Sequence, residues 1–431
     1  MGGVPVRNIF SASVALAISM MATQAIAGHM TVWVIDGETE KPYFQQLGDT
    51  FNAKFKGKGI TVDVTPIPSI NDATKAASQS GGLPDVIMID GPNMASMAWA
   101  GTLQPITNLL DPGIADDLLP AVKAQGTYTP TGDMYAISPY DSSVVLWGNK
   151  AYLEKAGVRI PKSPDDAWTR EEMRDALDKL SKVPGVKWPL DVKMNYGAGE
   201  WMTYGFSPLV QSNGGDLIDR TTFKAEGTIN SAANVDALNE LQDWVKKGWI
   251  APASAGDNTF YGDKTSALSW VGNWMWPAHK KGLGADLVLI PAPKFGPAGP
   301  KSGNGGWSWA VPASSKNLDD IKAFLNYAMS TEQVAQYANI TGYAPSRKSS
   351  IPLTQDFKEG GAGALFAEQG ACCAVVRPVY PGYPVITSAW SQAMVNILTG
   401  TADVKSELDK AAKAIDQDIA DNDGYPPFGT K

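Results

Sequence analysis

Three short β-rich runs, separated by two segments with helical character, limit the possible folds of this chain more than any other feature. The strand-like runs are TVWVIDG (31–37), ITVDVTPIP (60–68) and PDVIMID (84–90). Apolar residues spaced three and four apart predict a helix over 44–55, and a polar, Ala-rich segment predicts another over 71–80. Such alternation produces a parallel sheet covered by helices on both faces.

The loops beyond the carboxyl ends of parallel strands are where ligands bind in sheets of this kind. The loops after the first and third strands therefore carry polar candidates, and the extended run YAISPYDSSVVLWGN, which begins at Tyr135, adds two more. We expect a cleft lined by Asp36, Glu38, Asp90, Asn93, Tyr140 and Asp141.

Later segments continue the mixed α/β pattern. In TREEMRDALDKL, Thr169 and Glu172 have the spacing of a capping box, which satisfies backbone donors in the first turn of a helix. Further helices are predicted over 234–247, 318–329 and 404–421. Strands are predicted in ADLVLIPAP (285–293) and WSWAVPAS (307–314), and the Gly/Pro-rich segment 294–306 is predicted as a loop near a lobe boundary.

Length and charge restrict the class of protein. A chain of 431 residues, 44% of them hydrophobic, is long enough for two lobes or domains. The formal net charge is −8, and the chain has no dense run of lysine or arginine. This balance argues against a nucleic acid or an anionic membrane surface as partner.

The first 27 residues resemble a secretory signal peptide. They contain one basic residue, Arg7, an apolar run from Ile9 to Met21 and small residues at Ala25 and Ala27. The apolar run is shorter than the roughly 20 residues that a membrane span needs. We expect cleavage after Ala27 and, because no cysteine follows that site to accept a lipid, a product that is free in the periplasm.

Several kinds of chemistry lack their usual motifs. The chain has two histidines, no G-x-S-x-G elbow and no phosphate-binding glycine loop, and DNDG (421–424) lacks the glutamate that completes a calcium loop. We therefore predict no metal, no cofactor and no catalysis. A pair of carboxylates could still hydrolyse glycosides. The neighbouring Cys372 and Cys373 are interpreted as buried thiols or an incidental bridge.

Three tryptophans crowd into SWVGNWMWPAHKK (269–281). If this segment is helical, Trp270 and Trp274 share a face and Trp276 points nearly opposite, so at least one indole should line a cleft. Flat aromatic faces suit the apolar C–H faces of sugars, while carboxylates and amides suit the hydroxyls. His279 is predicted to be a surface or capping residue.

Motifs in a fixed order give the chain a resemblance to a known family. They are TVWVIDG, LPDVIMIDGPNMASMAWAGTLQPI, YAISPYDSSVVLWGNKAYLEKAG, SALSWVGNWMW, GGWSWAVPASSKN, TGYAPSRKS and AWSQAMVNILTGTADVKSELDKAAKAI. In this order the sequence resembles the extracellular solute-binding proteins of sugar ABC transporters, the group that contains maltose-binding protein.

The resemblance implies a type II periplasmic binding protein fold. Two α/β lobes would be joined by three hinge crossings, near Asp141, Trp307 and Tyr343. The N-terminal lobe would comprise 28–141 and 308–343, and the C-terminal lobe 142–307 and 344–431. It also implies a monomer that encloses a carbohydrate and delivers it to the permease subunits of an inner-membrane ABC transporter, without performing chemistry.

The same resemblance extends the set of binding residues. It assigns stacking positions to Trp201, Trp274 and Trp276, places Gly306 and Trp307 at the second crossing, and places Arg347 at the third. The loop GPNM after the third strand lacks the aromatic residue that the family often carries there, which favours a smaller or more polar ligand.

Two alternatives remain open at this level. The ligand could be an anionic glycoside or sugar phosphate, held by Arg347 or Lys348 and by backbone amides near Gly305 and Gly306. Alternatively, the chain could be a secreted glycosidase.

Overall fold

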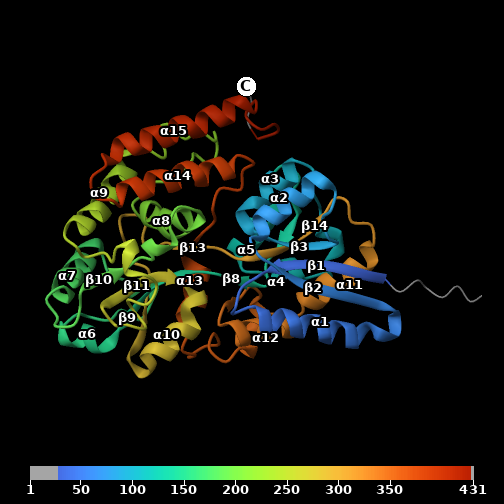
Figure 1. Cartoon of the computed structure of the whole chain (residues 1–431), viewed down its shortest axis with the longest axis horizontal. Coiled ribbons are helices and arrows are strands. Elements are labelled where there is room, and N and C mark those ends of the chain that lie inside the picture. The colour runs from blue at the N-terminus through green and yellow to red at the C-terminus, as the bar shows by residue number, and fades with distance from the viewer. Residues whose placement is uncertain (1–27, 429–431) are drawn as a thin grey trace, which may run out of the picture.

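The computed structural model describes residues 28–428, so the predicted signal peptide lies outside the described residues. Two sheets, each covered by helices, lie side by side, and several extended segments connect them (Figure 1). Within the described residues, no helix combines the length and the apolar character needed to cross a membrane.

The first sheet confirms the predicted strand–helix alternation. Its strand order is β2-β1-β3-β14-β4, with β7 also paired to β14. The strands β1, β2 and β3 are parallel, whereas β14 runs antiparallel to β3. The strands are β1 (Gly28–Ile35), β2 (Ile60–Ile67), β3 (Val86–Asp90), β4 (Leu103–Gln104), β7 (Ala136–Ile137) and β14 (Trp307–Pro312).

Helices that cover the first sheet supply the apolar faces of its core. The predicted face of α1 is buried at Phe44, Leu47 and Phe51, where it packs with Trp309 of β14. The helices of this part are α1 (Lys41–Phe55), α2 (Ile70–Ser80), α3 (Met94–Trp99), α4 (Ile114–Asp117), α5 (Pro120–Gly126), α11 (Leu318–Ala328) and α12 (Thr331–Thr341), with the small pair β5 (Thr127–Tyr128) and β6 (Asp133–Met134) beside them.

The second sheet has four strands in the order β10-β11-β9-β12. The strand β9 is buried along its whole length and runs antiparallel to both β11 and β12. Its residue Trp147 lies in a separate hydrophobic core together with Trp168 and Trp390. The strands are β9 (Val144–Asn149), β10 (Trp188–Asp191), β11 (Ser266–Gly272) and β12 (Leu287–Ile290).

The helices around the second sheet include α14 and α15, which pack against each other along one side of the molecule (Figure 1). The predicted C-terminal helix coincides with α15. The helices of this part are α6 (Lys150–Lys155), α7 (Arg170–Leu180), α8 (Glu200–Ser212), α9 (Ala232–Lys246), α10 (Trp276–Leu283), α13 (Ala364–Cys372), α14 (Tyr383–Ile397) and α15 (Val404–Asp421).

Three crossings of the chain join the two parts, as predicted. The first, β8 (Tyr140–Asp141), pairs antiparallel with β15 (Ala344–Pro345) of the third. Ser142 bridges to Gly305, which lies in the second crossing between β13 (Ser302–Gly303) and β14. The remaining short strand, β16 (Ala374–Val375), pairs with β13. The three connections therefore lie next to one another, and the residue boundaries of the predicted lobes stay a prediction.

One local prediction near the tryptophan cluster is wrong, that of His279. The segment itself is not one helix, the condition under which the three indoles were compared: Trp270 belongs to β11, a 3-10 turn spans Asn273–Met275, and α10 begins at Trp276. His279 is fully buried, with its ring 4.6 Å from that of Trp147. Burial and the nearby positive charge of Lys193 hold the pKa of His279 well below its usual value. The histidine of this motif is thus a core residue and not a surface or capping residue.

The other local predictions fare better. Thr169 and Glu172 form the complete capping box at the start of α7. Cys372 and Cys373 are bridged to each other, which is one of the two interpretations that the sequence allowed.

Replacing Thr169 by alanine should lower the free energy of unfolding by about 1 kcal/mol, because the backbone N–H of Glu172 in the first turn of α7 loses the hydroxyl that accepts its hydrogen bond. Urea denaturation measures the change. The control is Thr169→Ser, which keeps the capping hydroxyl and should unfold close to the wild type. Equal losses in both variants would contradict a role for the hydroxyl.

Candidate functional site

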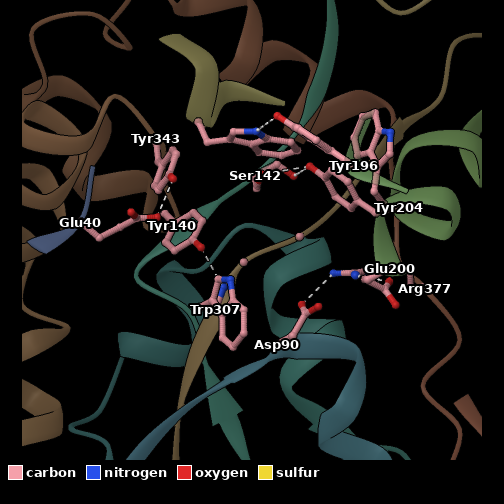
Figure 2. A pocket seen from close by; sticks show the side chains of 14 residues that line it. Glu40, Asp90, Tyr140, Ser142, Tyr196, Glu200, Tyr204, Trp307, Tyr343 and Arg377 are labelled. Carbon is pink, nitrogen blue, oxygen red and sulfur yellow. Dashed lines mark hydrogen bonds and ion pairs between the residues drawn. The ribbon is translucent and has the colours of Figure 1, made fainter. Parts of the chain in front are cut away.

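A cavity of about 260 Å³ lies where the crossings meet, between the two sheets (Figure 2). Residues of both parts of the molecule line it, from strand ends, helix starts and all three crossings. The lining residues are Glu40, Asp90, Tyr140, Ser142, Tyr196, Glu200, Trp201, Tyr204, Trp274, Gly305, Gly306, Trp307, Tyr343 and Arg377.

The second sheet contributes a group of aromatic rings. The indole of Trp274 packs edge-on against Trp201, with ring centres 5.8 Å apart, and lies 5.8 Å from the ring of Tyr204. Its Nε1–H donates to the hydroxyl of Tyr196 at 3.3 Å. A Cβ atom at Gly272 would clash with the Trp274 ring, so the glycine at the end of β11 lets this indole fold back toward the cavity.

A second aromatic group belongs to the crossings. Tyr140 stacks on Tyr343 with ring centres 4.7 Å apart, and its hydroxyl accepts a bond from the backbone N–H of Trp307 at 3.0 Å. Gly306 has a φ of 152°, a conformation that side chains rarely adopt, and a Cβ there would press on Ser138 and on the carbonyl of Tyr140. The glycine therefore allows the second crossing to approach the first.

One guanidinium connects the two parts of the molecule below these rings. Arg377 is 4% exposed and donates through Nη1 to Glu200 at 2.5 Å and through Nη2 to Asp90 at 3.3 Å. Asp90 ends β3 of the first sheet, whereas Glu200 begins α8 beside the second. Burial raises the pKa of Asp90 to about 6, although the charge of Arg377 opposes that rise.

Hydroxyl groups hold Glu200 in place as well. Its carboxylate accepts bonds from the hydroxyls of Tyr383 and Thr387, both on α14. The guanidinium of Arg377 lies over the ring of Tyr204, 5.2 Å from its centre. Residues of β3, α8 and α14 thus hold the ion cluster, and it faces a cavity half of whose lining residues are aromatic.

A third carboxyl group lines the opposite side of the cavity. Glu40 precedes α1, is 5% exposed and accepts a bond from the hydroxyl of Tyr343 at 2.6 Å. Burial raises the pKa of Glu40, and the bond from Tyr343 opposes that rise.

Six of the twelve binding residues that the sequence predicts line this cavity. They are Asp90, Tyr140, Trp201, Trp274, Gly306 and Trp307. The expectation that at least one of the clustered indoles lines a cleft is met by Trp274.

Three of the others lie on the surface near the cavity. Asp36 and Glu38 both form ion pairs with Lys41, at 2.9 and 2.5 Å, and the side chain of Glu38 is 90% exposed. Asp36 lines a neighbouring cavity of about 670 Å³, which shares Trp307 with the first. Asn93 lies in the turn after β3 and is not among the residues that line the cavity.

The structure corrects the remaining three. Asp141 is buried in the first crossing, where it accepts a bond from Asn304 Nδ2 at 2.7 Å. Trp276 is 5% exposed in the core, and its Nε1–H donates to Asp356 at 3.0 Å. Neither side chain lines the cavity.

Arg347, the third, points to the other side of its crossing. Its Nε donates to Asp117 at 2.7 Å and its Nη1 to the carbonyl of Met329 at 2.5 Å. Lys348 Nζ donates to the carbonyl of Asp116 at 3.2 Å. The two cations on which the anionic-ligand alternative depends are therefore engaged elsewhere.

Sequence reasoning did not identify Glu40, Tyr196, Glu200, Tyr204 and Arg377 as site residues. Glu200 directly precedes Trp201, which the sequence predicts as a site residue, and this adjacency is the one indication in the sequence that Glu200 lies at the site. Arg377 lies in VVRPVYPGYP, an apolar and proline-rich segment without helical or strand period, so nothing in its surroundings indicates a site. Within residues 28–428, no group of three or more acidic, histidine or cysteine side chains could hold a metal ion.

Comparisons with known proteins agree with this architecture. A sequence model described as "Bacterial extracellular solute-binding protein" matches residues 36–335. An arabinooligosaccharide-binding protein of Bacillus subtilis strain 168 is 24% identical, over 77% of this chain and 79% of its own length. An sn-glycerol-3-phosphate-binding periplasmic protein of Escherichia coli O1:K1 is 23% identical, over 95% and 96%.

Among solved structures, the GacH receptor of Streptomyces glaucescens, described in the unliganded form and in complex with acarbose, superimposes with a TM-score of 0.75. It is 27% identical, and the match covers 92% of this chain and 99% of that one.

The variant Asp141→Asn tests the polar contact at the first crossing. Burial raises the pKa of Asp141 to about 7. Between the ordinary aspartate pKa and this value the folded state binds more protons than the unfolded state, so the group's contribution to stability falls as pH rises. The slope is at most about 1.4 kcal/mol per pH unit.

Asparagine cannot titrate, so the difference in unfolding free energy between wild type and Asp141→Asn should fall from pH 4 to pH 7. Urea denaturation at several pH values measures it. Asp111→Asn, at an exposed site, is the control and should show a constant difference. Parallel curves for Asp141→Asn and the wild type would contradict the assignment.

Proposed function

This chain belongs to the bacterial extracellular solute-binding protein family, and from that premise we propose that its solute is a carbohydrate. The observation that carries the proposal is the composition of the cavity between the two sheets. Seven of its fourteen lining residues are aromatic, and the polar remainder includes carboxyl groups, a guanidinium and a serine. Aromatic faces match the C–H faces of sugars, and the polar groups match their hydroxyls.

The volume supports a short ligand. About 260 Å³ is slightly below the roughly 300–1,000 Å³ of most small-molecule pockets, and we propose a mono- or disaccharide or a small glycoside. Three carboxyl groups and one cation line the cavity, a balance that disfavours the alternative of an anionic glycoside or sugar phosphate. Two relatives are named for saccharides, an arabinooligosaccharide-binding protein and a diacetylchitobiose-binding protein, and these support a carbohydrate; a third is named for sn-glycerol-3-phosphate.

The predicted lobes give the proposal its mechanism. Two rigid lobes would close over the sugar. One would comprise residues 28–141 and 308–343, and the other residues 142–307 and 344–431. Closure of this kind is a known motion of periplasmic binding proteins. The full set of contacts to the ligand would form only when both lobes reach it, so these contacts would favour the closed state. The binding free energy would be what these contacts contribute beyond the costs of ordering and desolvation.

We further propose that residues 1–27 direct export and that the mature monomer delivers its sugar to the permease of an ABC importer, without binding nucleic acid. The proposal includes that the ligand is returned intact. Asp90 and Glu200 are both paired with Arg377, so neither is placed as an unpaired acid or base. Incubation with the bound sugar, followed by chromatography for released monosaccharide, tests this and the glycosidase alternative together.

A panel of mono- and disaccharides screened by thermal shift tests the class of ligand. A ligand that binds only the folded state raises the melting temperature. Isothermal titration calorimetry then measures the affinity for each sugar that stabilises the chain. If no carbohydrate stabilises it and another class of small molecule does, the proposal is wrong.

Trp274→Ala should weaken binding of the sugar identified in this way by about tenfold or more, because the side chain supplies a flat face of the cavity and closes the aromatic group with Trp201. Titration calorimetry measures the affinity, and circular dichroism confirms the fold. Trp188→Ala is the matched control, because that indole lies at the start of β10 outside the cavity. An unchanged affinity in Trp274→Ala would remove the stacking role.

A further inference from the structure

Glu40 is a buried carboxyl group at the cavity without a cation of its own. The residue is 5% exposed, and among the described residues no lysine, arginine or histidine forms an ion pair with it. Its polar contact is the hydroxyl of Tyr343, which donates to Oε1 at 2.6 Å. The nearby cation Lys41 turns away and pairs with Asp36 and Glu38 instead. Glu40 thus differs from Asp90 and Glu200, which share Arg377.

The local structure favours a negative charge at this position. Glu40 directly precedes the 15-residue helix α1, so its carboxyl group lies near the positive end of the helix dipole, which together with the bond from Tyr343 opposes the rise in pKa that burial causes. The preceding Gly37 lies so close to the carboxyl group that a Cβ atom would clash with it. The Asp-Gly loop after β1 therefore leaves room for a carboxylate that faces inward.

Aromatic rings surround the same end of the cavity. Tyr343 and Tyr140 stack at 4.7 Å beside Glu40, and Figure 2 shows the carboxyl group pointing toward them, while the Arg377 cluster lies on the far side. Aromatic faces attract cations, and they do so more strongly where water is excluded. A carboxylate beside such rings is the arrangement that recognises an ammonium group.

We propose that the Glu40 end of the cavity binds a protonated amino group of the ligand, so that the solute is an amine-bearing saccharide. This rests on the proposed function and narrows its substrate class. An ammonium group supplies the positive partner that Glu40 lacks. It can also donate up to three hydrogen bonds and lie against the tyrosine rings. A hydroxyl in the same place donates one bond and leaves the buried charge uncompensated.

The carboxylates at the other end do not offer the same site. The guanidinium of Arg377 already neutralises Asp90 and Glu200, and its remaining N–H groups suit hydroxyl acceptors. The cavity is therefore polarised, with an uncompensated acid near α1 and a compensated ion cluster near α8. A sugar amine and the sugar hydroxyls would be recognised at different ends.

Matched triplets of sugars test the proposal directly. Each triplet contains an amine, its parent hydroxyl sugar and its N-acetyl derivative: glucosamine, galactosamine and mannosamine with their counterparts, and chitobiose with cellobiose and diacetylchitobiose. Titration calorimetry, below the pKa of each amine, measures all affinities for the full mature chain. In at least one triplet the amine should bind about tenfold or more tightly than both neutral members.

Glu40→Gln keeps the size of the side chain and an acceptor for Tyr343 but removes the charge. It should reduce the affinity for the amine by about tenfold or more, and this loss should exceed the loss for any neutral sugar. Glu38→Gln is the matched control in the same loop, because that side chain is 90% exposed, and it should leave both affinities unchanged. A greater loss for neutral sugars than for the amine in Glu40→Gln contradicts the proposal.

The wild-type triplets decide the question even if a variant does not fold. Neutral members that bind as tightly as the amines, or glucose 6-phosphate that binds more tightly than glucosamine, overturn the amine site while carbohydrate binding stands. Absence of binding by every amine overturns it as well. If every carbohydrate fails and another class of solute binds, both this inference and the proposed function are wrong.

Discussion

The arrangement of the whole molecule depends on a buried charge contact between its two parts. Arg377 reaches Asp90 at the end of β3 and Glu200 at the start of α8, and it is almost completely removed from water. Burying an ion is costly, and a single carboxylate seldom repays that cost; two carboxylates and the hydroxyls of α14 give better compensation. The contact brings one strand end of the first sheet and one helix start beside the second to the same place, and that place is the cavity.

The rest of the cavity follows from how the chain crosses between the sheets. Tyr140, Trp307 and Tyr343 each lie on a different crossing. The side-by-side pairing of these segments stacks the ring of Tyr140 on that of Tyr343 and brings the backbone N–H of Trp307 to the Tyr140 hydroxyl. Gly306 makes the close approach possible because no side chain fits between it and the first crossing. If the two parts of the molecule shifted relative to each other, the contacts between these aromatic rings would change.

The sequence predicted what depends on local pattern. The strands and helices between residues 28 and 90, the capping box at Thr169 and the helix that ends at Asp421 all have strong periods or caps, and these are confirmed. Asp90 and Tyr140 were predicted because strand ends and crossings are recognisable. What failed depends on distant partners: Arg347 binds Asp117, 230 positions away, and Arg377 binds Glu200, 177 positions away. No spacing in a single sequence indicates such pairs.

The tryptophan cluster shows how one boundary decides the function of a side chain. Because the strand β11 continues to Gly272 and α10 begins only at Trp276, the three indoles follow three different backbone geometries. Trp270 and Trp276 turn into the core and donate their N–H groups to partners there, Gly205 and Asp356. Only Trp274, in the turn between strand and helix, is free to face the cavity. The switch from strand to helix therefore separates the two packing indoles from the one that can contact a solute.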